Sequence, residues 1–198
     1  MPFEAITIPE TPACVTAREV ATTYCSSALL NHSVRAYIFA AAYGDAHGIA
    51  FDAELLYVAS MFHDIGLVTE FDNRTVGFDD ASAHVAWVFA AGAQWSPARR
   101  RRLGEVVVSH MLDDIDVQAD PEGFLLERST SMDISGRHMQ DFTAGFKAEV
   151  LARYPRAGIA EEFLACFQEQ ARCKPDSSPA AALRDNIADR ILTNELDK

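Results

Sequence analysis

The sequence predicts an all-α protein, a bundle of helices around a buried core. Apolar residues recur at the three- and four-residue spacing of helices along most of the chain, and no stretch alternates convincingly between apolar and polar residues as a strand would. Hydrophobic residues make up 49% of the 198-residue chain, which is enough for a substantial core. We expect a single domain covering residues 1–198.

Capping and helix-stopping residues mark several of the helix boundaries. Asp52 is a good N-cap, and Gly66 and Gly92 are natural stops. Ser96 followed by Pro97 indicates an N-cap with a proline in the first turn. The expected helices cover about residues 16–27, 31–48, 52–64, 79–92, 96–111, 124–135, 137–154, 159–173 and 179–196. The acidic segment 113–123 is expected to be a loop, long enough to serve as a lid.

Composition narrows the classes of partner. The net charge of −12 and the pI of about 4.8 disfavour binding to nucleic acid and to anionic membranes, because both require a basic surface. We interpret the basic run 99–102 as a solvated helix face. A small-molecule substrate is therefore expected, and a homo-oligomer remains open.

Cysteine usage and the first residues bear on the compartment. The four cysteines contain no C-x-x-C pair, so we expect reduced thiols in a cytoplasmic protein. The first residues lack the basic region and apolar run of a secretory signal. The cysteines are Cys14, Cys25, Cys166 and Cys173.

An adjacent histidine and aspartate, His63 and Asp64, form the most informative feature of the chain. They stand at the polar end of an apolar helix, where a charge without a partner would be costly to bury. A divalent metal would be such a partner, because it takes a neutral ring nitrogen and a carboxylate oxygen directly. Further candidate ligands lie on separate expected helices, as a metal site in a bundle core requires. These candidates are His32, His84, His110 and Asp133.

Each candidate also has an ordinary structural explanation. A lone histidine on a helix is more often a core or surface residue than a ligand, and His84 among Ala, Val and Trp could simply pack. His47 and His138 are expected to be surface histidines. The donor set of nitrogen and oxygen suits zinc, iron, manganese or nickel, with one ion or with two that share Asp64.

Several short motifs resemble the HD-domain superfamily, and more closely its cyanamide hydratase-like branch. The segments are Asn-His-Ser-Val-Arg at 31–35, Phe-His-Asp-Ile-Gly-Leu at 62–67, Ser-His at 109–110 and Met-Asp-Ile-Ser-Gly-Arg at 132–137. The resemblance implies an all-helical HD domain with a core at about 29–137, on which helices of residues 138–198 pack. It also implies four metal ligands, His32, His63, Asp64 and Asp133, with His110 as a further active-site residue.

One segment departs from the branch. Residues 78–84 read Phe-Asp-Asp-Ala-Ser-Ala-His, where members of the branch usually carry a glycine after the acidic residue and no histidine. This puts a cyanamide-type substrate in doubt. It also moves the pattern toward a second HD group that binds two metals and includes cyclic-dinucleotide phosphodiesterases and di-iron oxygenases.

The expected chemistry is hydration or hydrolysis by a metal-activated water. Zinc is the first expectation, and one or two iron ions are the alternative. Asp64 could hold the metal or accept the water proton, and His110 could act as a general acid. Arg35 lies three residues after His32 on the same helix face and could anchor the substrate or support the site.

Three reactions remain open. The first is hydration or hydrolysis of a small C–N or nitrile-like compound, and the second is hydrolysis of a nucleotide or phosphate ester. The third is a di-iron oxygenase reaction, which requires His84 and His110 to bind a second metal.

Overall fold

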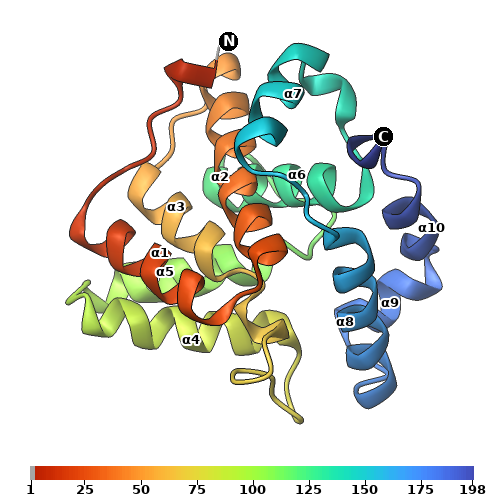
Figure 1. The fold of residues 1–198 in the computed structure, drawn as a ribbon. Coiled ribbons are helices and arrows are strands. Elements are labelled where there is room, and N and C mark those ends of the chain that lie inside the picture. The colour runs from red at the N-terminus through yellow and green to blue at the C-terminus, as the bar shows by residue number, and fades with distance from the viewer. Residues whose placement is uncertain (1–2) are drawn as a thin grey trace.

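The computed structural model describes residues 3–198, and helices dominate it (Figure 1). Within this range there are ten α-helices and four short 3-10 helices, and no strand, so the all-α prediction is confirmed. No helix in the same range is both long and apolar enough to cross a membrane. The α-helices are α1 (Pro12–Tyr24), α2 (Ser27–His47), α3 (Ala53–Phe62), α4 (Phe78–Gly92), α5 (Pro97–Ser109), α6 (Pro121–Ser135), α7 (Ala144–Arg153), α8 (Ile159–Cys173), α9 (Ser178–Arg184) and α10 (Ile187–Leu192). The 3-10 helices are η1 (Phe3–Ala5), η2 (Ile65–Leu67), η3 (Met139–Asp141) and η4 (Glu195–Asp197).

Helix α2 lies in the middle of the fold (Figure 1). Every residue from 32 to 42 is buried, so the helix is covered on all sides, as expected for a helix inside a bundle. It packs against α1, α3, α6 and α8. Side chains on different faces of α2 can therefore reach several other helices.

Two further groups of helices pack around α2 and its neighbours. Helices α4 and α5 pack side by side at one end of the molecule, and α5 also contacts α3 (Figure 1). Helices α8, α9 and α10 pack on one another, and α10 also contacts α6. A smaller apolar cluster joins these C-terminal helices to Leu29, Phe78 and Ile134.

Capping residues shift three helix starts from their expected positions. Thr11 caps α1 by accepting a hydrogen bond from the Cys14 amide at 3.3 Å, so the helix begins at Pro12 instead of residue 16. Ser26 caps α2 in the same way, which places His32 inside the helix and not near its start. Asp120 caps α6, so the irregular segment expected to reach residue 123 ends at this cap.

Two expected long helices are interrupted. The helix predicted over 137–154 is broken because Gly136 and His138 adopt left-handed backbone conformations, with φ of 73° and 62°, and α7 begins only after Thr143. The helix predicted over 179–196 is divided into α9, α10 and η4. Asn186 has φ of 61° at the first break, a conformation that asparagine tolerates better than most residues.

Candidate metal centre

Two helices bring the central side chains together. His32 projects from α2, and His63 and Asp64 follow the last residue of α3 directly. The backbone leaves the α-helical conformation at Asp64, with φ of −109°, and continues into η2. Gly66 then passes so close to α4 that a Cβ atom there would lie 2.2 Å from the carbonyl oxygen of Phe78. The glycine thus allows the chain to turn away immediately after the pair.

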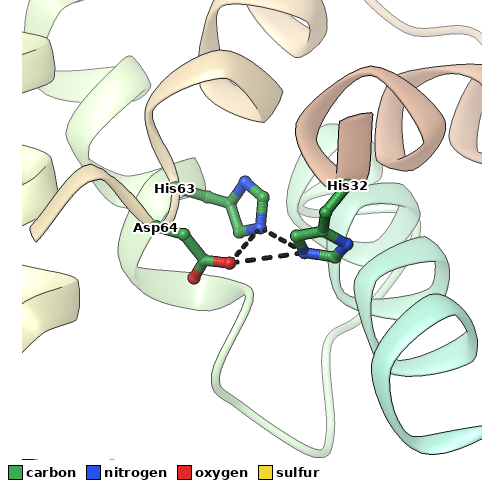
Figure 2. Close-up of side chains that lie close together, drawn as sticks. All are labelled: His32, His63 and Asp64. Carbon is green, nitrogen blue, oxygen red and sulfur yellow. Dashed lines mark hydrogen bonds and ion pairs between the residues drawn. The ribbon is translucent and has the colours of Figure 1, made fainter. Parts of the chain in front are cut away.

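The three side chains converge on one small volume (Figure 2). The Nε2 atoms of His32 and His63 are 3.0 Å apart, and both face the carboxylate of Asp64. Oδ2 of Asp64 lies 3.3 Å from Nε2 of His32 and 3.0 Å from Nε2 of His63. All three side chains are at most 2% exposed. One ligand atom from each residue lies within 4.8 Å of the others, as a shared metal ion requires.

Hydrogen bonds on the far side of each ring fix its tautomer. Nδ1 of His63 donates to the carbonyl of Ser60 at 2.8 Å, because a carbonyl can only accept. Nδ1 of His32 donates in the same way to Oδ2 of Asp133 at 2.7 Å. When neutral, both rings therefore present the lone pair of Nε2 to the centre. Metal-binding histidines are commonly held by such a hydrogen bond at the other nitrogen.

His110 extends this arrangement from the end of α5. Its Nδ1 donates to the carbonyl of Val107, and its Nε2 lies 3.6 Å from Oδ1 of Asp64. Nε2 of His110 and both carboxylate oxygens of Asp64 are buried without a hydrogen-bond partner. Buried acceptors without a donor are costly, and these acceptors face the lone pairs of two further rings. A divalent cation satisfies all of these atoms together, so the residues fit a metal.

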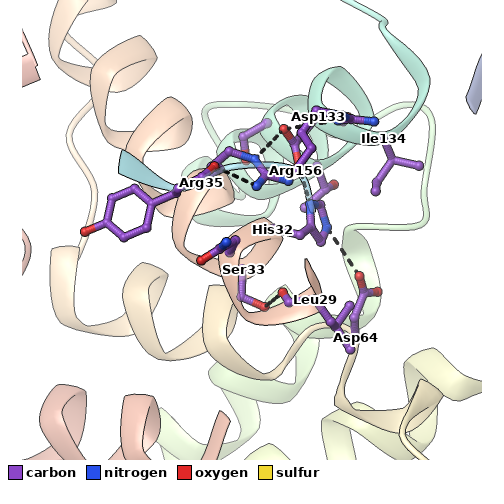
Figure 3. A network of polar contacts seen from close by, with 12 residues as sticks. Leu29, His32, Ser33, Arg35, Asp64, Asp133, Ile134 and Arg156 are labelled. Carbon is purple, nitrogen blue, oxygen red and sulfur yellow. Dashed lines mark hydrogen bonds and ion pairs between the residues drawn. The ribbon is translucent and has the colours of Figure 1, made fainter. Parts of the chain in front are cut away.

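Asp133 lies behind His32, on the side away from the other two side chains (Figure 3). Its Oδ2 accepts hydrogen bonds from Nδ1 of His32 and, at 2.6 Å, from Nη2 of Arg35, while Oδ1 accepts from Nε of Arg35 at 2.8 Å. Arg35 and Asp133 are both completely buried. Asp133 was expected to be a metal ligand, and in this structure its oxygens accept hydrogen bonds from His32 and Arg35.

Arg35 was expected to contact substrate or to support the site, and the structure favours support. Its Nη1 also donates to the carbonyls of Tyr154 and Pro155, both at 3.0 Å, and it does not border the cavity beside the site. The spacing of three residues places Arg35 and His32 on the same side of α2, where both reach one carboxylate. Arg35 therefore contacts the same carboxylate as His32 and not the cavity.

Charge pairing keeps the two aspartates ionised. Burial alone would raise the pKa of Asp133, but the guanidinium of Arg35 and the hydrogen bond from His32 hold that pKa far below its ordinary value. Burial also acts to raise the pKa of Asp64, yet the neighbouring His63, His110 and His32 lower it overall. Both carboxyl groups therefore stay ionised, and the Asp64 carboxylate is available to a cation.

The two histidines respond differently to the same surroundings. Burial lowers the pKa of His63 below its ordinary value, and Asp64 offsets this only in part, which favours the neutral ring that a metal ligand needs. For His32, burial acts to lower the pKa, but the carboxylates of Asp133 and Asp64 beside its two ring nitrogens raise it overall.

The structure does not bring His84, an expected ligand, to the other candidate ligands. Ser82, two residues earlier on α4, faces inward and accepts a hydrogen bond from the Gly66 amide at 2.8 Å. Two residues turn a helix by about 200°, so His84 lies on the opposite, exposed face.

A cavity of about 200 Å³ opens beside the centre. His32, His63, Asp64 and His110 border it at one end, and apolar side chains that include Phe163 form part of its wall. Its other charged residues are three carboxylates and two guanidinium groups, Asp113, Glu127, Asp185, Arg137 and Arg190. Arg137 already pairs with Asp113 at 2.9 Å and with Glu127 at 3.5 Å. The cavity therefore has more negative than positive groups.

Several residues around the site were not found from the sequence. Glu127 and Phe163 border the cavity, and Arg156 and Asn194 contact the backbone beside Asp133. The basic run also differs from a purely solvated face, because Arg99 pairs with Asp52 at 2.7 Å. No local pattern marks these residues, since their roles depend on contacts with other elements of the fold.

Comparison with known families agrees with the geometry. Residues 29–121 match the family model of the HD domain. This range includes His32, His63, Asp64 and His110 and ends before Asp133. The match supports placement in the HD-domain superfamily, and it does not distinguish the cyanamide hydratase-like branch. No curated protein matches the chain.

Proposed function

Because residues 29–121 match the HD domain, a family of metal-dependent hydrolases, we propose that the chain hydrates or hydrolyses a small substrate at a divalent metal. The observation that carries this proposal is the buried group of acceptors. The Nε2 atoms of His32, His63 and His110 face the carboxylate of Asp64, and both oxygens of that carboxylate are buried without a hydrogen-bond partner in the described chain.

His32, His63 and Asp64 would hold the ion, with His110 as a neighbour that can also ligate it. A divalent metal bound there lowers the pKa of a bound water and supplies hydroxide near neutral pH. Zinc is the first ion to test, because two histidines and a carboxylate suit it, and iron is the alternative.

His110 has the geometry of a proton carrier. Its Nδ1 is held by the Val107 carbonyl, so Nε2 is the atom free to take up a proton or to deliver one toward the cavity. Asp64 is within 3.6 Å of this nitrogen and stays ionised, so it can orient a protonated His110. Arg35 and Asp133 act one step further away by fixing the orientation of His32.

Apart from the metal itself, the charged side chains of the cavity favour an uncharged substrate. A phosphate ester would bring negative charge next to Asp113, Glu127 and Asp185, and one of the two arginines is already paired. We therefore propose a small neutral compound with an electrophilic C–N or nitrile-like centre. The di-iron oxygenase alternative loses support because His84 lies on an exposed face.

Metal analysis tests the proposal. Metal-free protein should take up about one equivalent of zinc or iron, measured by mass spectrometry of the elements after desalting. His63→Ala and Asp64→Asn should lose this uptake, while His84→Ala, which also removes one imidazole, should keep it. Absence of uptake by the unaltered protein, or full uptake by His63→Ala, would refute the proposed site.

A substrate panel tests the reaction. Small nitriles, cyanamide-type compounds and amides should give product with the zinc- or iron-loaded protein, and the same protein with His110→Ala should be slowed by about 100-fold or more. Phosphate release from nucleotides or phosphate esters, with no reaction of the neutral compounds, would contradict the assignment of a neutral substrate.

A further inference from the structure

The end of α6 is fixed by groups from a distant part of the chain. The last four carbonyls of a helix have no partner within it, and Asp133 and Ile134 lie in this last turn. The carbonyl of Asp133 accepts hydrogen bonds from Nη1 of Arg156 and, at 2.9 Å, from Nδ2 of Asn194. Asn194 also donates to the carbonyl of Ile134 at 3.1 Å. Both donors are buried, with 6% and 3% of their surface exposed.

Arg156 is held in turn by Asp197. Nε of Arg156 lies 2.5 Å from Oδ1 of Asp197, and Nη2 lies 2.9 Å from Oδ2, so the ion pair has two parallel hydrogen bonds. Nη1 of Arg156 is also 3.6 Å from Oδ1 of Asp133. Asp197 thus holds a guanidinium that contacts both the backbone and the side chain of Asp133.

These contacts form a continuous series from η4 to the centre: Asp197, Arg156, Asp133 and His32 (Figure 3 shows the last three). We propose that Asn194 and Asp197 are positioning residues for the metal site. They fix the backbone and the carboxylate of Asp133, and Asp133 fixes the ring orientation and tautomer of His32. This inference rests on the proposed metal site, and it assigns a role in that site to Asn194 and Asp197.

The physical consequence is a change in metal affinity. Groups behind a metal ligand orient it, and their loss typically weakens metal binding by about 10–100-fold. Asp197 is two steps further from the ligand His32 than Asp133, because Arg156 lies between them, so we expect the lower end of this range for Asp197→Asn, about tenfold. The side chain of Asp197 is 34% exposed, so the variant leaves no fully buried cavity.

Cobalt(II) binding is the experiment, because its absorption spectrum reports the geometry of the ligands as well as the affinity. The full chain is freed of metal and titrated with Co²⁺ against a chelating dye. Asp197→Asn should bind about tenfold more weakly with an altered spectrum, and Asp197→Glu, which keeps the carboxylate, should recover part of the affinity. Glu195→Gln is the matched control, since it removes the same charge from an exposed residue of η4.

The outcomes separate the two proposals. Unchanged Co²⁺ affinity and spectrum in Asp197→Asn would overturn the positioning role and leave the metal site intact. Equal weakening in Asp197→Asn and Glu195→Gln would also overturn it, because a general charge effect would then suffice. No Co²⁺ binding by the unaltered protein would overturn the metal site itself. Asn194→Ala serves as a second variant, with the same tenfold expectation.

Discussion

Replacing Asp133 by asparagine tests whether this residue is structural support or a metal ligand. In the metal-free protein its two oxygens accept three hydrogen bonds, from Arg35 and His32, with all partners fully buried. Asparagine keeps the shape and removes the charge, so the guanidinium of Arg35 is left buried without its counterion. Breaking such a pair costs about 3–5 kcal/mol, a large part of the roughly 5–15 kcal/mol that stabilises a typical domain.

The assay is unfolding of Asp133→Asn by urea and by heat in the presence of a chelator, so that metal binding does not contribute. For a chain of this length the expected loss corresponds to a fall in Tm of about 6–20 °C. Glu4→Gln is the control, because the pair of Glu4 and Arg153 is exposed and should contribute less than about 1 kcal/mol. If the metal-free Asp133→Asn protein is as stable as the unaltered one, and differs only when metal is present, Asp133 is a ligand and our reasoning is wrong.

The difference in unfolding free energy between the unaltered protein and Asp133→Asn should depend on pH in a defined direction. The native pKa of Asp133 lies below the value of about 3.9 expected in the unfolded chain, because Arg35 and His32 favour the ionised form more than burial disfavours it. A depressed native pKa contributes stability that is complete above the unfolded pKa and is lost as the pH falls toward the native one. The gap in unfolding free energy between the two proteins should therefore be full at pH 6 and shrink below about pH 4.

Three further predictions use other parts of the fold. Gly66→Ala should lower the unfolding free energy by about 1–3 kcal/mol, because the added Cβ would lie 2.2 Å from the carbonyl oxygen of Phe78 and the backbone at one of the two residues must move. A urea unfolding curve that matches that of the unaltered protein would contradict this. His84→Ala should leave zinc uptake, measured by elemental analysis, within error of the unaltered protein, and a clear loss would restore His84 as a ligand. Burial raises the pKa of Cys25 to about 12. At pH 8 iodoacetamide should therefore modify the exposed Cys173 before Cys25, as judged by peptide mass spectrometry. Equal rates of modification would argue against the burial of Cys25.

The local features of the site could be predicted because they depend on neighbours in sequence. The apolar run before His63 predicts a buried helix, and Gly66 predicts its end, so the pair had to stand at a helix terminus next to the core. The presence of His32 on a second buried helix follows from the same periodicity. Which way His84 points could not be predicted. The apolar residues of α4 are compatible with more than one buried face of the helix.

The role of a buried polar side chain could not be predicted where two different partners are possible. A buried aspartate such as Asp133 can ligate a metal or pair with an arginine, and the choice depends on where Arg35 lies relative to it. The breaks at His138 and Asn186 were missed for a related reason. A left-handed residue costs little local energy at asparagine, and packing of the following helix decides whether it is used.

By itself, the sequence determined the helical class, the pair at the end of α3 and the nitrogen and oxygen donor set, because periodicity, capping and ligand chemistry are properties of short segments. Only the tertiary structure decided that His32 and His110 point at Asp64, that Asp133 stands behind His32, and that Asn194 reaches the end of α6. The physical reason is that a buried polar group takes whichever partner the packing of distant helices brings within hydrogen-bond reach, and no local pattern encodes that distance.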